Sequence, residues 1–207
     1  MTDYRGLILE DTREGATDEA IARLEARLGA RLPDDYRQFL HTCNGADWEY
    51  DVEVPLAGGE RELMSFSLFG LDLDEQWEAN PYELEQARAL PDYPATGLLP
   101  IGRDGGSSLL LLDLRDGRQE VAAMVAGLPA WTGRRQGGDE YVVLAASFDG
   151  YLDLLHLADD TIAQHIDRFM ISPSSVDATL AWFDSGSSGW RDRHRERWNA
   201  RVTIKPI

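Results

Sequence analysis

The sequence predicts an α+β fold, in which a mixed, mainly antiparallel sheet packs against N-terminal helices and a C-terminal helical extension follows. Three observations support this fold class: helical spacing of apolar residues over 17–43, strand-like segments with turn signals over 98–146, and helical spacing again over 159–183. Helices, then strands, then helices, without a repeating βαβ pattern, are typical of α+β proteins. We expect residues 1–158 to form one domain, with 159–207 as a helical extension and basic tail packed on it.

The first two helices have recognisable start and stop signals. The first is expected to follow Thr17, a typical N-cap, and to end at Gly29. The second is expected to begin at Pro33, since proline suits the first helical turn, and to stop at Asn44-Gly45, which tolerate left-handed backbone. The apolar residues at helical spacing are expected to line one core: Ile21, Leu24, Leu28, Tyr36, Phe39, Leu40 and Cys43.

The middle of the chain is expected to form strands. Residues 46–62 are predicted to form a polar loop or weak hairpin, and Leu63–Gly70 a strand. Leu98–Gly102 and Ser108–Leu114 are predicted to pair as a second hairpin. Its turn is placed at Asp104-Gly105, because Asp-Gly readily adopts the positive φ of a tight turn.

Two more strands and a helix are expected to complete the sheet domain. Asp116-Gly117 marks a turn before a strand over 119–125. The apolar run over 140–146 predicts a central strand. Ser147 is expected to cap a helix whose inner face carries Phe148, Tyr151, Leu152 and Leu155.

The C-terminal segment is predicted to contain two helices and a tail. The helix over 159–170 is expected to bury Ile162, Ile166 and Phe169, and that over 173–183 to bury Val176, Leu180 and Phe183. Residues 189–207 form a basic, aromatic tail that is expected to end in a short strand. Its arginines and tryptophans could bind nucleic acid, but docking on the acidic remainder of the chain is the favoured reading.

The chain is strongly acidic. It carries 37 acidic and 20 basic side chains, a net charge of −17, and its only lysine is Lys205. The segment over 189–207 is net +4, which leaves −21 for residues 1–188. Such a surface repels phosphate backbones, so direct nucleic-acid binding is disfavoured, and it attracts basic proteins. Acidity that only aids solubility is the alternative.

Compartment signals point to the cytoplasm. Cys43 is the only cysteine, which excludes an internal disulfide and suits a reducing compartment. No apolar run approaches the roughly 20 residues of a membrane-spanning helix. The first residues lack the apolar segment of a secretory signal, so we expect no membrane association.

The segment 21–46, IARLEARLGARLPDDYRQFLHTCNGA, resembles the opening of SUKH domains. Its motif residues are Gly29, Leu32, Pro33, Tyr36, Phe39, Asn44 and Gly45, and a second stretch, over 98–114, matches the family's hairpin at Asp104 and Gly105. A third match covers 142–155. The sequence departs from the pattern at Ala46, where the family often has glycine, and residues 159–207 lie outside the resemblance. These motif residues are expected to support the fold rather than to take part in catalysis or binding.

The candidate motifs for catalysis and metal binding do not have the geometry that these functions require. His41 and Cys43 stand two residues apart on one helix, so their side chains diverge and cannot form a nucleophile–base pair. A calcium loop with Asp72, Asp74, Gln76 and Glu83 as ligands would need glycine where Trp77 stands. We therefore expect no enzyme activity, metal or cofactor.

The resemblance implies a cytoplasmic immunity protein that binds a cognate protein toxin, often a nuclease, or another basic protein. The alternatives are a regulatory or scaffold module related to fungal regulators of cell-wall synthesis, and an enzyme on an unfamiliar template. Acidic and aromatic residues cluster in two segments and are the candidate partner-binding residues: Trp48, Glu49, Asp51, Asp72, Asp74, Glu75, Trp77 and Glu78. The oligomeric state stays open.

Overall fold

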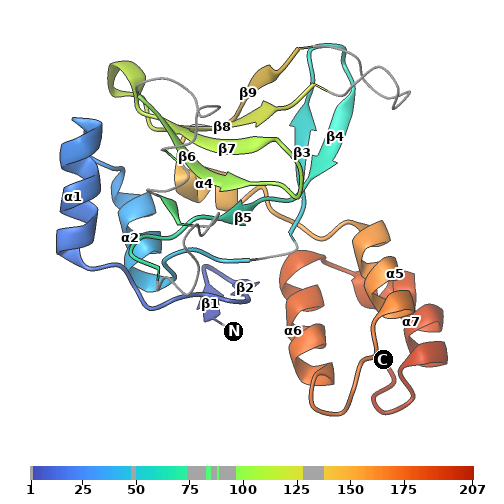
Figure 1. Cartoon of the computed structure of the whole chain (residues 1–207). Coiled ribbons are helices and arrows are strands. Elements are labelled where there is room, and N and C mark those ends of the chain that lie inside the picture. Colours follow the sequence, from blue (N-terminus) through green and yellow to red (C-terminus); the bar gives the residue numbers. More distant parts are fainter. Residues whose placement is uncertain (1, 48–49, 74–82, 85–87, 89–96, 128–137) are drawn as a thin grey trace.

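The computed structural model describes residues 2–47, 50–73, 83–84, 88, 97–127 and 138–207 (Figure 1). Its helices are α1 (Asp18–Leu28), α2 (Asp34–Thr42), α4 (Phe148–Leu152), α5 (Asp159–Arg168), α6 (Val176–Gly186) and α7 (Trp190–Arg201), with a short 3₁₀ turn at Arg115–Gly117. Its strands are β1 (Thr2–Tyr4), β2 (Leu7–Leu9), β3 (Val52–Pro55), β4 (Arg61–Met64), β5 (Ser67–Leu68), β6 (Leu98–Arg103), β7 (Leu109–Asp113), β8 (Glu120–Val125) and β9 (Glu140–Ala145).

The predicted α+β class is confirmed. One antiparallel sheet has the order β5-β6-β7-β8-β9, and the pairs β1-β2 and β3-β4 form separate hairpins. Strand β7 is buried along its whole length, as expected for the middle of a sheet. Phe148 of α4 joins the sheet to α2, because its ring lies 5.0 Å from that of Tyr36 and 5.1 Å from that of Phe39.

The first two helices form as their local signals predict. The Thr17 hydroxyl accepts a hydrogen bond from the Ala20 amide at 3.2 Å, and Gly29 ends α1 at φ 65°. Pro33 precedes α2, and Asn44 and Gly45 follow it with positive φ. Their packing is also as predicted, except that Leu28 is only partly buried; Ile21, Leu24, Leu32, Tyr36, Phe39, Leu40 and Cys43 are buried.

Asn44 also fastens α2 to a distant segment. Its side chain is buried, donates to the Leu71 carbonyl and accepts from the Leu71 amide, both at 2.7 Å. Gly45 is required next to it, because a Cβ there would lie 3.0 Å from the Gly70 nitrogen in a backbone region that favours glycine. The scaffold role expected for this Asn-Gly pair is therefore visible in its contacts.

Residues 46–70 fold differently from the prediction in one respect. The weak hairpin exists as β3-β4, but the single strand over Leu63–Gly70 is wrong. The chain leaves β4 at Met64, which pairs with Val52, and enters the large sheet at Ser67, which pairs with Arg103. The predicted strand is divided because its two halves belong to two sheets.

The hairpin over 98–114 is confirmed as β6-β7, but its turn is not the tight one expected. Neither Gly105 nor Gly106 adopts a positive φ. Instead, the Asp104 carboxylate accepts hydrogen bonds from the amides of Gly106, at 2.8 Å, and Ser108, at 3.0 Å. A side chain thus supplies the acceptor that closes a longer loop. The turn at Asp116-Gly117 forms with positive φ at both residues.

Strand β9 lies at an edge of the sheet, so the prediction of a central strand is wrong. Its apolar run suggested burial on both faces. In the structure Tyr141 is 40% and Val143 46% exposed, because one face of the strand is open. Ser147 caps the following helix as predicted, accepting from the Gly150 amide at 3.0 Å.

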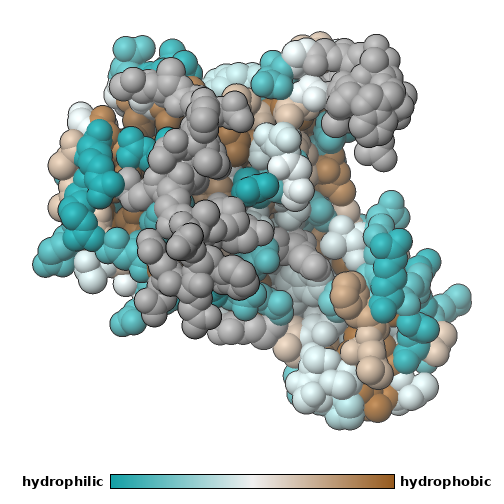
Figure 2. All heavy atoms as spheres, in the orientation of Figure 1, coloured by the Kyte–Doolittle hydropathy of each residue, from teal (hydrophilic) through white to brown (hydrophobic). Residues whose placement is uncertain are grey.

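The C-terminal segment forms three helices that pack on one another (Figure 1). The tail is helix α7, and a turn rather than the predicted short strand follows it. Trp190 and Trp198 are fully buried against Phe183 of α6. The outer side of this lobe, near α5 and α7, is largely hydrophilic (Figure 2).

The tail docks through charge pairs, as predicted, but on the neighbouring helices. Its basic residues pair with acids of α5 and α6: Arg191 with Asp184, Arg193 with Asp159, Arg197 with Asp167, and Lys205 with Asp177. These acids all lie within the extension itself. Among the described residues, the tail forms no ion pair with an acid of the sheet domain.

Tyr36→Phe and Tyr151→Phe are expected to leave the free energy of unfolding unchanged or to raise it by about 1 kcal/mol. Both side chains are fully buried, and neither hydroxyl has a hydrogen-bond partner in the described chain. Tyr50→Phe is the control, because its hydroxyl accepts from the Ile8 amide at 2.9 Å and contacts Ser185 Oγ at 2.5 Å. Urea unfolding should show a loss for Tyr50→Phe alone. An equal loss in all three variants would contradict this assignment.

Candidate functional site

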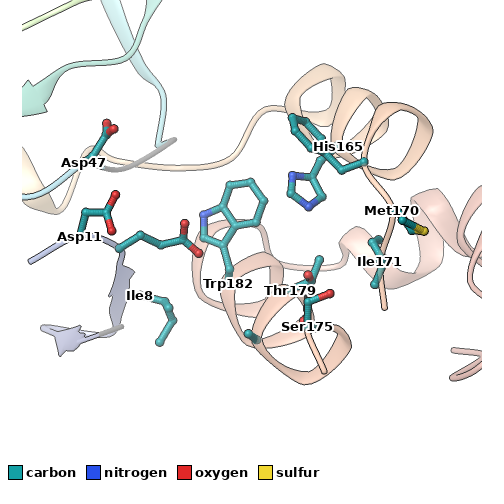
Figure 3. A pocket seen from close by; sticks show the side chains of 12 residues that line it. Ile8, Asp11, Asp47, His165, Met170, Ile171, Ser175, Thr179 and Trp182 are labelled. Atoms are coloured by element: carbon teal, nitrogen blue, oxygen red, sulfur yellow. Dashed lines mark hydrogen bonds between the residues drawn. The ribbon is translucent and has the colours of Figure 1, made fainter. Parts of the chain in front are cut away.

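A cleft of about 410 Å³ lies between the end of the first hairpin and the C-terminal helices (Figure 3). One side comes from β2 and the residues after it, together with Asp47. The other comes from α5, α6 and the turn between them. The residues that line it are Ile8, Glu10, Asp11, Asp47, His165, Phe169, Met170, Ile171, Ser175, Ala178, Thr179 and Trp182.

The first side is acidic. An isolated antiparallel bridge pairs Glu10 with Asp47, and Asp11 follows with a left-handed φ of 48°. All three side chains are exposed. Asp47 accepts a hydrogen bond from Ser67 Oγ at 2.7 Å, but none of the three forms an ion pair within the described residues. Four acids of α5 and α6 are paired with bases of the tail, whereas these three have no such pair in the described chain.

The second side is aromatic and apolar. The ring centroid of His165 lies 4.8 Å from that of Phe169 and 4.9 Å from that of Trp182. Burial lowers the pKa of His165, so the imidazole stays neutral at pH 7. Its Nδ1 is buried without a partner in the described part of the chain. Figure 3 shows Trp182 between the acidic residues and His165.

One prediction is wrong at the rim of the aromatic side. Phe169 was expected to be buried with Ile162 and Ile166, but it is 55% exposed. Helix α5 ends at Arg168 and Phe169 is extended, with ψ 146°, so its side chain leaves the buried face. Met170 beside it is 92% exposed. Two large apolar side chains therefore border the cleft in contact with solvent.

Trp182 contributes an unused hydrogen-bond donor. Its side chain is only 9% exposed, and its indole nitrogen has no acceptor among the described residues. By contrast, the indole nitrogens of Trp190 and Trp198 donate to Asp184 Oδ1 and the Lys205 carbonyl. In Figure 3 the nitrogen edge of Trp182 faces the side on which Asp11 and Asp47 lie. The nitrogen is not among the fully buried polar atoms without a partner, so a ligand in the cleft can accept its hydrogen bond in place of water.

Most of the partner-binding residues predicted from sequence lie outside the described chain: Trp48, Glu49, Asp74, Glu75, Trp77 and Glu78. Of the remaining two, Asp72 is exposed, has a left-handed φ of 49°, and pairs with Arg23 of α1 at 2.5 Å. Asp51 is only 8% exposed. Its carboxylate is used inside the molecule, so the proposed contact surface leaves Asp51 out.

Asp51 connects the sheet domain to α5. Its Oδ2 accepts from the Ala158 amide at 2.9 Å and from the Thr161 hydroxyl at 2.8 Å. Its backbone forms two hydrogen bonds with His156, at 2.7 and 3.0 Å. The carboxylate thus satisfies one free amide at the start of α5, and its negative charge is stabilised by the positive end of the helix dipole.

Asp51→Ala is expected to lower the free energy of unfolding by about 2 kcal/mol, as for loss of a helix cap. Asp51→Asn retains an oxygen acceptor and should lose less than half of that amount. Chemical denaturation measures both losses, and hydrogen exchange should locate the weakening at the first turn of α5. An Asp51→Ala variant as stable as the parent would show that the carboxylate does not hold this helix.

Sequence reasoning missed the cleft residues. Asp47 stands one position before the predicted group, and Glu10 and Asp11 follow a hairpin that was not predicted. The signal for that hairpin is Arg5-Gly6, which adopt φ values of 55° and 83°, as in a type I′ turn. No local pattern indicates that this hairpin meets α6.

Metal and membrane signals are absent from the part of the chain that the structure describes. There, no group of three or more histidine, cysteine, aspartate or glutamate side chains could hold a metal ion. Of the ligands considered for a calcium loop, only Asp72 and Glu83 are described. None of the described helices is both long enough and apolar enough to cross a membrane.

The fold defines a class: an α+β domain in which two N-terminal helices, joined by a Leu-Pro corner and closed by Asn-Gly, precede an antiparallel sheet. Residues 15–154 match the model of the SMI1 / KNR4 family (SUKH-1). The chain belongs to this family, and the family suggests protein partners. A comparison with curated proteins found no match. The match leaves out both β1-β2 and α5–α7, so of the residues that line the cleft it includes only Asp47.

Proposed function

We propose that this protein is a cytoplasmic immunity protein that binds a basic bacterial toxin, with a nuclease as the leading example. It acts by covering a surface that the toxin needs, and it uses no cofactor or catalytic group. Family membership supports a protein partner. The observation that carries the proposal is the placement of its charge.

The negative charge belongs entirely to the family domain and its N-terminal hairpin. Residues 159–207 contain seven acidic and seven basic side chains, so the whole net charge of −17 falls on residues 1–158. A surface of that sign attracts a basic protein over long range and speeds association. Nuclease sites are basic because they bind phosphates, so an array of carboxylates is complementary to them.

The contact surface is proposed to include the acidic side of the cleft and the neighbouring acidic segments. Asp72 is described and exposed. The proposed contacts outside the described residues are Trp48, Glu49, Asp74, Glu75, Trp77 and Glu78. Exposed apolar side chains at the rim, Phe169 and Met170, suit a protein interface.

Residues 159–207 are proposed to be an extension packed on the domain formed by 1–158. The contacts that support this organisation join Tyr50 to Ser185 at 2.5 Å and the Leu157 amide to the Gly186 carbonyl at 2.7 Å. A Cβ at Gly186 would lie 2.4 Å from Leu157 Cγ, so the two parts approach closely there.

Co-expression with the toxin encoded by the neighbouring gene tests the proposal. The protein should restore growth, and the two chains should elute as one complex in size-exclusion chromatography. Stopped-flow association should slow by about tenfold or more between low and physiological salt, because screening removes the long-range attraction.

Continued toxicity without a complex would overturn the proposal. So would a rate of association that does not depend on salt, because the charge placement would then play no part. Capture of a non-toxin partner in the same assay would instead favour the regulatory binding module.

A further inference from the structure

We propose that the cleft between β2 and α6 receives the side chain of an arginine carried by a loop of the partner protein. The inference rests on the proposed protein-binding function and adds the chemical group that this surface recognises. Four features support it: the charge of one side of the cleft, the aromatic residues of the other, an unused donor between them, and the size of the cavity.

The size suits one side chain with its adjoining backbone. Small-molecule sites usually enclose roughly 300–1,000 Å³, and this cleft, at about 410 Å³, lies near the lower limit. It is bounded by a hairpin end and two helices. Its volume leaves room for a long side chain.

The acidic side requires a cation. Glu10, Asp11 and Asp47 are gathered by the Glu10–Asp47 bridge and lack ion pairs within the described chain. By contrast, several acids of the C-terminal helices are paired, such as Asp184 with Arg191. Three neighbouring carboxylates repel one another, and a bound cation relieves that repulsion.

The aromatic side selects a guanidinium over an ammonium group. A planar guanidinium stacks on aromatic faces and is weakly hydrated, whereas an ammonium is compact and strongly hydrated. Trp182, Phe169 and His165 line the cleft opposite the acids, and Phe169, at 55% exposed, is accessible for stacking. His165 is neutral at pH 7, so it does not repel the cation. The aliphatic stem of an arginine matches Ile8 and Ile171, which also line the cleft.

The indole nitrogen of Trp182 points to a peptide rather than a free cation. This nitrogen donates a hydrogen bond, and the side chain is nine-tenths buried with no acceptor in the described residues. An arginine side chain has no acceptor, and neither does a polyamine. A backbone carbonyl next to the arginine supplies one, so a loop satisfies both the carboxylates and the indole.

Most of the site lies outside the region that matches the family model. Of the lining residues only Asp47 falls within the region that matches the family model, residues 15–154. The hairpin before that region and the helices after it create the rest. A specific partner can thus be recognised by additions to a common domain.

Binding of blocked pentapeptides to the full chain tests the inference. One peptide carries arginine between glycines, the second citrulline, which has the same shape without the charge, and the third lysine. The six tryptophans give six indole N–H signals in a nitrogen-15 NMR spectrum, and Trp182→Phe identifies the relevant one. The arginine peptide should shift that signal saturably. Citrulline should bind at least about tenfold more weakly, and lysine should also bind more weakly than arginine.

Matched charge variants provide the control. Glu10→Gln with Asp11→Asn and Asp47→Asn removes the three carboxylates of the cleft and should weaken arginine-peptide binding by at least about tenfold. The control removes three exposed acids outside it: Glu14→Gln, Glu19→Gln and Glu60→Gln. It should bind the peptide within about twofold of the parent. Spermidine replaces the peptide in a further titration and should leave the Trp182 signal in place.

Equal binding of the arginine and citrulline peptides would overturn the inference, and so would a Trp182 signal that stays fixed at tens of millimolar peptide. Spermidine that shifts this signal as the arginine peptide does would also overturn it in favour of a small-cation site. If the toxin complex forms equally well with both triple variants, the inference fails and the proposed function stands. If the arginine peptide binds as expected but no toxin complex forms, the proposed function fails instead.

Discussion

Trp198→Ala is expected to lower the stability of the C-terminal helices by about 3–5 kcal/mol, as for removal of a buried aromatic side chain. Trp198 is fully buried. Its ring centroid lies 5.5 Å from that of Trp190 and 6.2 Å from that of Phe183, in edge-to-face arrangements. Its indole nitrogen donates to the Lys205 carbonyl at 2.7 Å and so holds the end of the chain. The substitution removes all three contacts at once.

Hydrogen exchange followed by mass spectrometry measures this loss segment by segment. Protection should fall over 159–207, whereas α1, α2 and the central strands should change little. Arg195→Ala on the same helix is the control, because Arg195 is exposed and pairs only with Asp192 three residues away among its described contacts. Arg195→Ala should lower the stability of the C-terminal helices by less than about 0.5 kcal/mol. Unchanged protection in Trp198→Ala would show that the aromatic cluster does not secure α7.

The cleft depends on the same cluster. Phe183, which packs on Trp198, lies next to Trp182, with ring centroids 5.0 Å apart. Loss of Trp198 should therefore loosen the aromatic side of the cleft and weaken the binding of the arginine peptide. The contacts from Trp198 through Phe183 to Trp182 thus connect the stability of the C-terminal helices to peptide binding in the cleft.

Local sequence signals were sufficient to predict the bounds of the first two helices. Thr17, Gly29 and Pro33 act through their own backbone or their nearest neighbours, as Asn44 does through its positive φ, so their effect on the helix ends is visible in a short stretch of sequence. The hairpin over 98–114 was predictable for the same reason. Its turn was misjudged because Asp104 acts there through its side chain rather than through its φ.

Tertiary partners were not predictable. The position of β9 at an edge depends on which strands remain to pair with it, and the sequence of β9 does not contain that information. Asp51 was read as a contact residue because it is acidic and adjoins Trp48, yet its carboxylate bonds to Ala158 and Thr161 more than 100 positions later. The hydrogen-bonding role of a polar side chain is set by those distant neighbours.

The cleft shows the same limit for function. Asp11 and Trp182 lie at opposite ends of the chain, and neither belongs to a recognisable motif. The charge of the sequence did indicate a basic partner, because net charge adds over the whole chain regardless of fold. Where that partner contacts the surface depends on how the hairpin and the helices pack together.

Asp113→Asn is expected to lower the free energy of unfolding at pH 7 by about 2–3 kcal/mol. The Asp113 side chain at the end of β7 is fully buried. It accepts hydrogen bonds from the Arg115 amide at 3.0 Å, from Arg115 Nε at 2.9 Å and Nη2 at 2.7 Å, and from the Tyr141 hydroxyl at 2.8 Å. Asparagine keeps the shape but removes the charge and replaces one acceptor oxygen with an NH2 donor. Two of these hydrogen bonds are therefore lost while the packing stays.

The same contacts make the loss depend on pH. The Arg115 guanidinium, with the other donors, holds the pKa of Asp113 well below its usual range. A depressed pKa in the folded state stabilises the protein above the unfolded-state pKa of about 3.9, and that stabilisation is lost as pH falls further. The difference between the parent and Asp113→Asn should therefore be full at pH 7 and shrink progressively below about pH 4.

Urea unfolding of both proteins over this pH range measures the difference directly. Comparison of the two chains cancels the many other carboxylates that titrate in the same range, because they are common to both. Burial and the adjacent Asp113 carboxylate raise the pKa of Tyr141 to about 12, so its hydroxyl remains a donor throughout the experiment. A difference that stays constant down to about pH 3 would contradict the depressed pKa, since only ionisation distinguishes aspartate from asparagine in this way.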